Sequence, residues 1–292
     1  MKLAVAIPTV GRKALVTELL RHLERQTRLP DEVVISAPDP SHVDQSVSCR
    51  FPVTFVFGPK GSFAQRNRAL DHLGGTADAV VFFDDDFIPA DDYLHIVDTG
   101  FSQNPDWAAI TGRFLKDGAK LGGFTFAQGL EILRDAERQP REPLEIVDHV
   151  GAHGANMSLR LSAVGPLRFD ERLVLYGWHE DIDLTSQLRA KGRVVGLNTL
   201  YGVHLGVRSG KASGVPFGYS QVVNIIYLMR KGTVPFSFGS KLMARNIAAN
   251  VVKSLWPEPH IDRRGRLRGN LLGAFHAATG RVEPEYILKL VR

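Results

Sequence analysis

The sequence predicts an α/β protein in which helices flank a mostly parallel sheet, followed by a helical C-terminal extension. Three observations support this fold class. Short apolar runs alternate with segments of helical spacing over the first third of the 292 residues. One apolar run ends in three consecutive aspartates, at residues 84–86. The pattern beyond residue 210 is mainly helical, so we expect an α/β domain over residues 1–214 and an extension over residues 215–292.

Strand and helix signals alternate from the N-terminus onward. Pro8 ends a first apolar run at residues 3–7, and Pro30 ends the amphipathic helix that follows it. The next predicted elements are a strand at 33–35, a strand at 53–57, a helix at 62–73, a strand at 79–83, a helix at 93–101 and a strand at 108–115. Strands that alternate with helices form βαβ units, and these units give parallel pairing.

The middle of the chain is less regular. The glycine-rich residues 118–129 predict a loop or hairpin, and residues 151–160 fit neither the strand period nor the helix period. A helix that begins near Glu180 is expected to end at Gly192. The remaining predicted elements are a strand at 194–197 and helices at 222–229 and 242–252.

Charge is distributed unevenly along the chain. The whole sequence carries +5, but residues 230–292 hold twelve Lys and Arg against four Asp and Glu, a net charge of +8. Such a basic segment attracts phosphates on nucleic acid, on anionic lipid or on a nucleotide-linked substrate. A solvated basic face without a specific partner agrees with the charge equally well.

Composition excludes several classes of protein. Because Cys49 is the single cysteine, the chain forms no intramolecular disulfide and no cysteine-based zinc cluster. No apolar run approaches the roughly 20 residues that a membrane span needs. Residues 1–10 are too short for the core of a signal peptide. We therefore expect a cytoplasmic protein that is soluble or peripheral.

The segment Phe-Phe-Asp-Asp-Asp at residues 82–86 carries the clearest chemical signal. Side chains alternate along a strand, so Asp84 and Asp86 are expected to project together while Asp85 points away. Ligands of open α/β sheets bind at the carboxyl ends of strands, where Mg²⁺ or Mn²⁺ would remove the repulsion between two carboxylates. The alternative is a loop of aspartates that caps the next helix. Asp91 and Asp92 suit that role better, so we favour the metal site.

An ordered set of segments resembles the family 2 glycosyltransferases, which have the GT-A fold. The segments are Val-Ala-Ile-Pro-Thr at 5–9, Phe-Ala-Gln-Arg-Asn-Arg-Ala at 63–69, Asp-Asp-Asp at 84–86, Gly-Ala-Asn-Met-Ser-Leu-Arg at 154–160 with Phe-Asp-Glu at 169–171, and Gly-Trp-His-Glu-Asp-Ile-Asp-Leu at 177–184. The resemblance covers about residues 2–204. It implies a Rossmann-like catalytic domain with a nucleotide-sugar half at about 1–115 and an acceptor half at about 116–214.

The resemblance also implies an activity. The implied reaction is the inverting transfer of a sugar, of the hexosyltransferase type, from a nucleotide-diphosphate sugar to a hydroxyl group of a saccharide or lipid-linked acceptor. The donor is a UDP-sugar by default, the cofactor is Mn²⁺ or Mg²⁺, and the pathway is surface polysaccharide or glycolipid assembly. Two alternatives stay open: a catalytically silent component that binds nucleotide sugars within an assembly complex, and a sugar nucleotidyltransferase.

Individual residues take roles from the same resemblance. Asp181 is the implied general base, and Glu180 is a second catalytic residue that binds the acceptor or orients the loop. The other implied acceptor-binding residues are Asn156 and Trp178. The implied metal ligands are Asp84, Asp86 and His204, of which the histidine is equally open to a structural role. The implied donor-binding residues are Pro8, Thr9, Arg12, Ser36, Asp39, Arg66, Asp84, Asp85 and Asp86.

Three of these assignments have open alternatives. Many family members carry an acidic pair after the second strand, whereas this chain has Ile-Ser-Ala-Pro-Asp at residues 35–39, so the identity of the base stays open. Acidic residues in the first turn of a helix, at positions 180 and 181, are often only partners of the helix dipole. Trp178 is as typical of a core as of a platform that stacks on a sugar. Arg208 or Lys211 is expected to fold over the phosphates as a lid.

The extension suggests two kinds of partner. One hypothesis is that an apolar stripe and an arginine cluster meet anionic headgroups, on the inner face of the cell membrane. The stripe consists of Val222, Ile225, Ile226 and Met229, and the cluster of Arg263, Arg264, Arg266 and Arg268. The second hypothesis, which we favour slightly, is packing of these helices against the catalytic domain or against a second subunit in a homo-oligomer. No base-reading module accompanies the arginines, so nucleic acid is not an expected partner.

Overall fold

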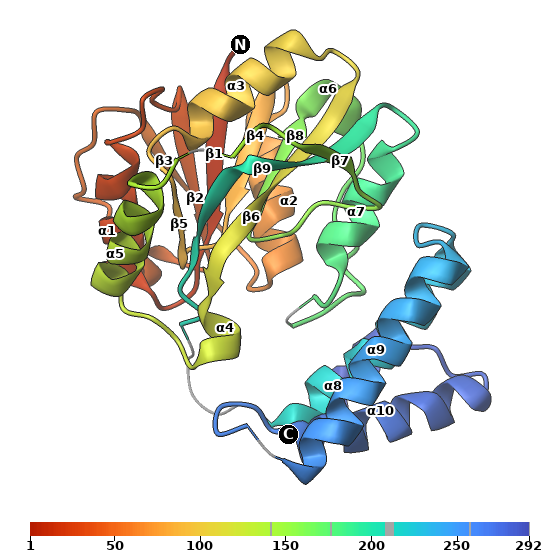
Figure 1. Cartoon of the computed structure of the whole chain (residues 1–292). Coiled ribbons are helices and arrows are strands. Elements are labelled where there is room, and N and C mark those ends of the chain that lie inside the picture. Colours follow the sequence, from red (N-terminus) through yellow and green to blue (C-terminus); the bar gives the residue numbers. More distant parts are fainter. Residues whose placement is uncertain (141, 176, 208–212, 257, 292) are drawn as a thin grey trace.

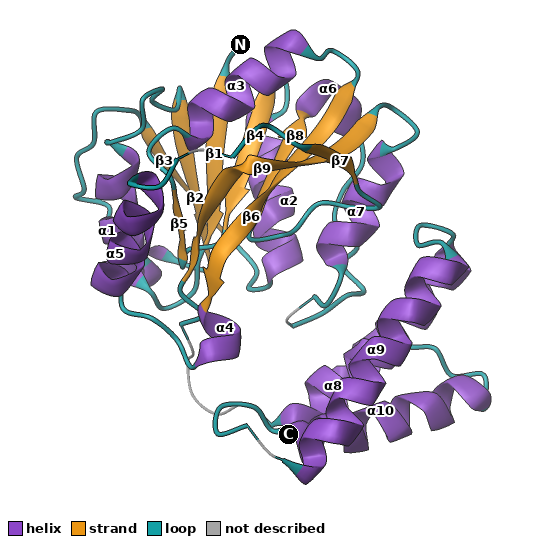
Figure 2. Cartoon of the chain, viewed as in Figure 1, coloured by secondary structure: helices purple, strands orange, loops and turns teal. Residues whose placement is uncertain are grey.

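The computed structural model describes residues 1–140, 142–175, 177–207, 213–256 and 258–291. A central sheet has helices on both faces, and three long C-terminal helices form a group beside it (Figures 1 and 2). This is the α/β architecture with a helical C-terminal extension that the sequence predicts.

The elements have the following bounds. The strands are β1 (Leu3–Pro8), β2 (Glu32–Ala37), β3 (Val53–Phe57), β4 (Ala79–Phe83), β5 (Phe87–Pro89), β6 (Trp107–Asp117), β7 (Ile146–Asp148), β8 (Asn156–Arg160) and β9 (Arg193–His204). The helices of the α/β domain are α1 (Lys13–Leu23), α2 (Ser62–Leu73), α3 (Tyr93–Gln103), α4 (Gly118–Leu121), α5 (Phe126–Glu137), α6 (Leu161–Val164) and α7 (Glu180–Leu188), with a 3-10 turn, η1 (Pro40–His42). The extension contains α8 (Gly214–Lys231), α9 (Phe236–Leu255), α10 (Arg263–Ala278) and η2 (Pro284–Lys289).

The sheet combines a parallel half with a mixed half. Its order is β3-β2-β1-β4-β8-β6-β9-β5, and β7 pairs with β9. The first four strands in this order are parallel, as predicted from the strand–helix alternation. Beyond them, β8 runs antiparallel to both β4 and β6, whereas β6 and β9 pair in parallel. The carboxyl ends of β1, β2 and β4 therefore meet at one edge of the sheet, where open α/β sheets bind ligands.

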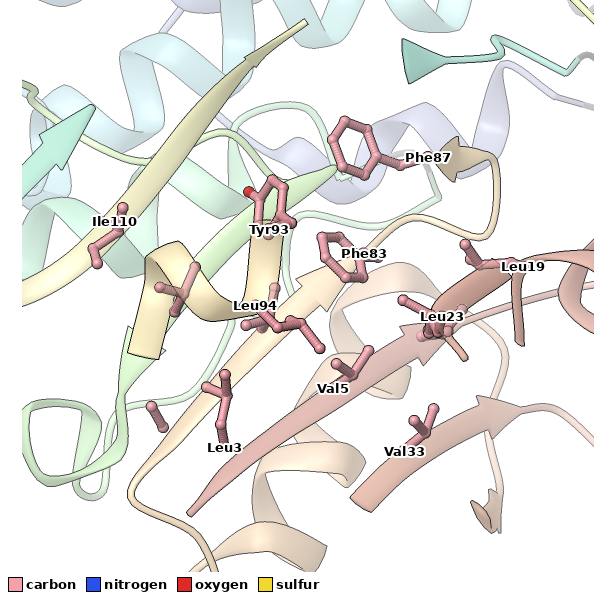
Figure 3. Close-up of a cluster of buried hydrophobic side chains, with 14 of the residues drawn as sticks. Leu3, Val5, Leu19, Leu23, Val33, Phe83, Phe87, Tyr93, Leu94 and Ile110 are labelled. Atoms are coloured by element: carbon pink, nitrogen blue, oxygen red, sulfur yellow. The ribbon is translucent and has the colours of Figure 1, made fainter. Parts of the chain in front are cut away.

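Side-chain alternation along the parallel strands builds a core on each face. Val5 pairs with Val33 of β2 and Val81 of β4, and all three belong to the core under α1 and α3. Figure 3 shows this cluster, in which Phe83 and Tyr93 also lie. The intervening residues of the same strands face a second core under α2 and α7. A strand that is buried on both faces reads as a continuous apolar run, which is why these strands were visible in the sequence.

The structure corrects the prediction for residues 118–129 and assigns a secondary structure to residues 151–160. The prediction of a loop or hairpin over residues 118–129 is wrong, because α4 and the start of α5 occupy this segment. Thr125 and Gln128 form a capping box at the start of α5, a signal that the surrounding glycines obscured. Residues 151–160, unassigned from the sequence, contain β8, which lies between β4 and β6.

Glycines let α8 and α10 approach each other closely. A Cβ atom at Gly218 would lie 2.0 Å from the carbonyl oxygen of Arg266. One at Gly269 would lie 2.1 Å from the carbonyl oxygen of Val215. Any larger residue at these two positions would push the helices apart, so the glycines belong to a helix–helix contact.

The apolar stripe that was expected to meet a membrane lies inside the protein. Val222 and Ile225 are 2% and 1% exposed, and Ile226 and Met229 are partly buried. The membrane hypothesis for this stripe is wrong, because side chains that are packed within the protein are not available to lipid. The structure agrees instead with packing against the α/β domain, where Met229 lies in a cluster with Leu173 and Ile182. Among the described residues, no helix has the length and apolar character needed to cross a bilayer.

A buried carboxylate joins the extension to the α/β domain. Asp183, in α7, is fully buried. Its Oδ2 atom accepts a hydrogen bond from Lys231 Nζ at 2.7 Å, and its Oδ1 atom accepts one from the Thr233 hydroxyl at 2.7 Å. Lys231 also donates to Asp170 at 2.6 Å. The extension thus packs against α7, while the boundary at residues 214 and 215 stays a prediction.

The Lys231→Met variant is expected to have a free energy of unfolding about 3 kcal/mol lower, because it leaves the Asp183 carboxylate buried without its counter-charge. Urea unfolding followed by circular dichroism measures this difference. The double variant Asp183→Asn/Lys231→Met removes both charges and is expected to recover most of the loss. Equal losses in the single and double variants would contradict the ion-pair explanation.

Candidate active site

The three aspartates follow β4 in a tight turn and do not continue the strand. β4 ends at Phe83, and the Phe87 amide donates to the Asp84 carbonyl oxygen at 3.0 Å. Asp84 and Asp86 nevertheless lie together, beside His204 at the end of β9. One possible ligand atom from each of these three residues lies within 4.8 Å of the other two. The turn, and not strand alternation, therefore brings the two carboxylates to one side.

Asp117, in β6, is the pairing partner of His204, in β9, and its carboxylate holds the histidine ring. His204 Nδ1 lies 2.8 Å from Asp117 Oδ1, and Nε2 lies 3.5 Å from Asp86 Oδ1. Burial disfavours the imidazolium, but the two carboxylates raise the pKa of His204 to about 10. Metal-binding histidines typically have a carboxylate behind one ring nitrogen and the metal in front of the other. The donor set of Asp84, Asp86 and His204 thus fits a divalent cation.

Asp85 points the other way, toward the end of β1. Its carboxylate accepts hydrogen bonds from the Thr9 hydroxyl and the Arg12 guanidinium, both at 2.6 Å. Arg12 Nη1 also lies 3.3 Å from Asp86 Oδ2. Burial raises the pKa of Asp85 to about 6, and the charge of Arg12 opposes this shift. Polar side chains from the loop between β1 and α1 and from the turn after β4 therefore share one edge of the sheet.

Arg66, in α2, connects the candidate metal ligands with α7. It is 5% exposed and donates to Asp84 Oδ1 at 2.8 Å, to the Gly154 carbonyl oxygen at 3.1 Å and to Glu180 Oε1. The Ser62 hydroxyl donates to the other oxygen of Glu180 at 2.9 Å. Burial raises the pKa of Glu180, and the Arg66 guanidinium opposes this shift. Glu180 is 3% exposed, and these bonds hold its carboxylate, in α7, against α2. Its implied roles in catalysis and acceptor binding stay predictions.

Asp181 lies close to the same arginine but is more accessible than Glu180. Its Oδ2 atom accepts a hydrogen bond from the Gly154 amide at 2.7 Å, and its side chain is partly exposed. A Cβ atom at Gly154 would lie 3.1 Å from Asp181 Oδ2 and 3.3 Å from Arg66 Nη2. Asp181 and the Arg66–Asp84 pair therefore belong to one site. The other carboxylate oxygen of Asp181, Oδ1, accepts a hydrogen bond from the Ile182 amide at 2.8 Å, and of the two neighbouring acids Asp181 is the more exposed.

His179 precedes both acids and has an unusual backbone. Its φ angle of 72° is in the left-handed region. The side chain is partly exposed, but its Nε2 atom is buried and has no hydrogen-bond partner among the described residues. Burial lowers the pKa of His179 from 6.5 to about 4. Protonation of this nitrogen is therefore easier in the unfolded chain than in the native protein.

This difference predicts a loss of stability in mild acid. The contribution of His179 is complete above pH 6.5 and is lost as the pH falls toward 4, since the unfolded chain then binds the extra proton. The His179→Asn variant does not titrate, and Asn tolerates the left-handed conformation. Between pH 6.5 and 4 the free energy of unfolding is expected to fall less in this variant than in the wild type, by a difference of at most about 3 kcal/mol. Urea unfolding at several pH values in this range measures the difference, and His95→Asn, at an exposed histidine, is the control. If the free energy of unfolding changed with pH in the same way in all three proteins, His179 would not be the residue responsible.

The remaining predicted donor residues lie at the ends of β1 and β2. Pro8 ends β1 and pairs with Ser36 of β2. The Ser36 hydroxyl is buried and accepts a hydrogen bond from Arg68 at 2.9 Å. Asp39 is exposed, and its side chain caps η1 by accepting a hydrogen bond from the Ser41 amide at 2.8 Å. Their roles in donor binding stay predictions, and Asp39, on the loop after β2, is more exposed than Ser36.

The predicted acceptor residues lie in different surroundings. Asn156 is fully buried at the start of β8, and its Oδ1 atom accepts a hydrogen bond from a threonine of β6 at 3.0 Å. Trp178 packs against Phe217 of α8, with ring centroids 4.6 Å apart. The acceptor roles of both residues stay predictions. Arg208 and Lys211, the expected lid residues, lie outside the described residues.

Sequence reasoning assigned no role to four residues that orient the site. They are Ser62, Gln65, Asp117 and Gly154. Gln65 Nε2 donates to the carbonyl oxygens of Thr9 and Ser36, at 2.8 and 2.6 Å, and so ties the end of β1 to that of β2. Gln65 and Gly154 lie within segments that resemble the family. For Ser62 and Asp117 the sequence holds no signal, since their partners are 118 and 87 residues away.

Comparison with solved structures shows that this chain shares its fold with other proteins. No protein-family model and no curated protein matches the sequence. TarS of S. aureus, residues 1–349 in complex with UDP-GlcNAc, superposes with a TM-score of 0.57 and 17% identity over 97% of this chain and 83% of that chain. The mannosyltransferase PcManGT from Pyrobaculum calidifontis, in complex with GDP-Man and Mn²⁺, gives a TM-score of 0.55 and 17% identity over 99% of this chain and 78% of that chain. The chain spans 39% of the length of a longer TarS structure. It thus has the mixed α/β fold, with C-terminal helices, of these two sugar-nucleotide complexes.

Proposed function

We propose that the protein is a metal-dependent, inverting glycosyltransferase that uses a nucleotide-diphosphate sugar. The observation that carries the proposal is the buried Arg66, which bonds Asp84 on one side and Glu180 and the Gly154 carbonyl on the other. Asp181 accepts a hydrogen bond from the same Gly154. A candidate cation site and an accessible carboxylate are thereby held in a fixed relation. The fold shared with complexes of UDP-GlcNAc and GDP-Man supports a nucleotide-sugar donor.

Asp84, Asp86 and His204 are the residues that would hold Mn²⁺ or Mg²⁺. When bound, such an ion supplies positive charge beside the departing diphosphate. Carboxylate ligands suit Mn²⁺, and the similar PcManGT structure contains this ion. Asp117 keeps the His204 ring turned toward Asp86, which prepares the site for a cation.

The donor nucleotide is proposed to lie along the ends of β1 and β2. Arg12 is partly exposed between Asp85 and Asp86, so its guanidinium can approach a phosphate while it holds the two aspartates in place. Thr9 supports Asp85 from the end of β1. Asp39 offers an exposed carboxylate to a ribose or base hydrogen-bond donor, and a UDP-sugar stays the default.

The proposed transfer moves one sugar and one proton. The oxygen of the acceptor hydroxyl forms a bond to the anomeric carbon as the bond from that carbon to the diphosphate oxygen breaks. The nucleoside diphosphate leaves with the bonding electron pair, and attack from the opposite side inverts the configuration. Asp181 takes the hydroxyl proton as general base. Glu180, held by Ser62 and Arg66, positions the first turn of α7 and with it Asp181.

The acceptor is proposed to be a saccharide or a lipid-linked saccharide, in polysaccharide or glycolipid assembly. Trp178 lies three residues before Asp181 and is partly exposed. An indole ring can cover the apolar face of a sugar, and its contact with Phe217 would fix the orientation of that ring. The extension would then contribute to the acceptor side of the site through α8.

Two other functions are less well supported. A catalytically silent component would have no use for an accessible Asp181 next to the metal-ligand group. A nucleotidyltransferase would need a glycine-rich basic loop directly after β1, whereas residues 8–13 read Pro-Thr-Val-Gly-Arg-Lys. The glycosyltransferase is therefore the favoured function.

Thermal unfolding with Mn²⁺ and a panel of nucleotide sugars tests the proposed function. A ligand at about 100 times its Kd stabilises the native state by about 2.7 kcal/mol, so the correct donor is expected to raise the Tm. Incubation of that donor with candidate acceptors is then expected to release nucleoside diphosphate. No stabilisation by any nucleotide sugar would contradict the proposed donor class. Stabilisation without turnover would favour the silent component, and pyrophosphate release from a nucleoside triphosphate and a sugar phosphate would favour the nucleotidyltransferase.

A further inference from the structure

One surface of the extension exposes large apolar side chains beside arginines. We define the α9–α10 surface as Val251, Val252, Leu255, Trp256, Arg264, Arg268, Leu271 and Phe275. Leu255 and Trp256 are 70% and 72% exposed, and Leu271 and Phe275 are 65% and 64% exposed. It is a different surface from the buried stripe on α8 that the sequence suggested.

On each of the two helices the residues of the α9–α10 surface lie along one stripe, and the two stripes adjoin. On α10, Arg264, Arg268, Leu271 and Phe275 are separated by four, three and four residues, the spacing of one helix face. The apolar residues of α9 fall in its last turns, around Ser254. Arg264 Nε donates to the Ser254 carbonyl oxygen at 3.3 Å, so the arginine end of the α10 stripe meets the apolar end of α9. Figure 1 shows both helices in the C-terminal group beside the sheet.

We propose that the α9–α10 surface docks onto an anionic membrane surface. A cluster of exposed apolar side chains on a soluble domain commonly marks a contact surface. Leu, Phe and Trp side chains enter the boundary between headgroups and acyl chains, and arginines bind the anionic headgroups around them. The net charge of +8 over residues 230–292 adds a longer-range attraction to the same anionic surface.

Charge favours a membrane over a second copy of the chain. A two-fold dimer through this surface would place the same arginine-bearing surface against itself, and the like charges of Arg264 and Arg268 would repel. The nearby acids Glu258 and Asp262 are already engaged within the extension: Glu258 accepts from Arg263, and Asp262 caps α10. Anionic headgroups supply the opposite charge that a second copy lacks.

Co-sedimentation with vesicles of equal parts phosphatidylglycerol and phosphatidylcholine tests this proposal. The full-length protein is expected to bind these vesicles at low salt, to bind less at high salt, and to bind pure phosphatidylcholine weakly. Each basic residue at an anionic surface contributes about 1 kcal/mol, so Arg264→Gln/Arg268→Gln is expected to lower the partition coefficient about 30-fold. Leu255→Ser/Trp256→Ser is expected to lower binding at both salt concentrations. All these side chains are exposed, so the variants are expected to keep the wild-type Tm.

A matched control removes the same charge elsewhere. Arg138 and Lys191 are exposed in the α/β domain, and Arg138→Gln/Lys191→Gln is expected to bind vesicles as the wild type does. Absence of wild-type binding at low salt would overturn the proposal, and so would an equal loss in the control variant. A dimer that Leu255→Ser/Trp256→Ser dissociates in sedimentation velocity, without vesicle binding, would assign the surface to a second copy. No donor or acceptor is added, so the outcome is independent of sugar transfer.

Discussion

The Asp181→Asn variant is expected to lose about 1,000-fold in kcat, because a positioned general base contributes about 10²–10⁴-fold and an amide cannot take the hydroxyl proton. Donor binding is expected to be unchanged. The Asn oxygen can still accept the Gly154 amide, so the loop that also contacts Arg66 keeps its position, and only the bond from the Ile182 amide to the second oxygen is lost. The change therefore separates proton transfer from the assembly of the site.

Two measurements establish this separation. Release of nucleoside diphosphate gives kcat, and calorimetry with Mn²⁺ and the donor found in the thermal screen gives Kd. Glu171→Gln is the matched control, because Glu171 is an exposed acid outside the candidate site and its variant is expected to behave as the wild type. An Asp181→Asn variant with wild-type kcat would show that another group takes the proton.

The Asp86→Asn variant is expected to lose at least about 1,000-fold in kcat/KM, since a catalytic cation supplies several kcal/mol of charge stabilisation. Asp86 is 5% exposed and makes several contacts within the site. Its Oδ2 atom accepts the Val207 amide at 2.9 Å, and Arg12 and His204 lie on either side. An Asn side chain keeps the shape of this site but removes the negative charge that a divalent cation needs.

Binding of Mn²⁺, followed by electron paramagnetic resonance, checks the metal site without turnover. Asp86→Asn is expected to abolish this binding, and Asp117→Asn to weaken it about 10- to 100-fold because the His204 ring loses its orienting partner. Without a cation the pKa of His204 is raised to about 10, so Mn²⁺ must displace a proton and its affinity is expected to rise with pH below that value. Asp135→Asn, on the exposed face of α5, is the control. Wild-type Mn²⁺ affinity in Asp86→Asn would refute the metal assignment.

Most strands and helices of the first hundred residues could be predicted because each is delimited locally, but the three-residue strand β5 was not predicted. Pro8 follows the apolar run of β1, and the acidic residues after Phe83 end β4. Residues 118–129 were misassigned because only two of their four glycines, Gly122 and Gly123, lie in a turn, where they follow α4 with positive φ angles, whereas Gly118 and Gly129 serve packing. A Cβ atom at Gly118 would lie 2.0 Å from the Leu205 carbonyl oxygen, and one at Gly129 would lie 2.6 Å from the Leu205 side chain. Nothing in the local sequence distinguishes a glycine required by a distant neighbour from one required by a turn.

The candidate site was predictable in part. The pairing of Asp84 with Asp86 is correct, although a turn and not a strand produces it. The structure also places His204 next to this pair. The link through Arg66 was not predictable, because this residue and Glu180 are 114 positions apart and meet only when α2 packs beside α7.

The sequence by itself determined the α/β class, the parallel pairing of the first strands and the acidic end of β4. The signals for these features are hydrophobic periodicity, the positions of prolines and a run of acidic residues, and each is contained in a few consecutive residues. Only the tertiary structure decided which acid stays accessible beside Arg66, and which apolar stripe of the extension is buried. Both depend on burial, and burial depends on contacts between segments far apart in the chain. Ile225 and Leu255 are both apolar and both helical, yet they are 1% and 70% exposed, since only the first has the rest of the protein packed against it.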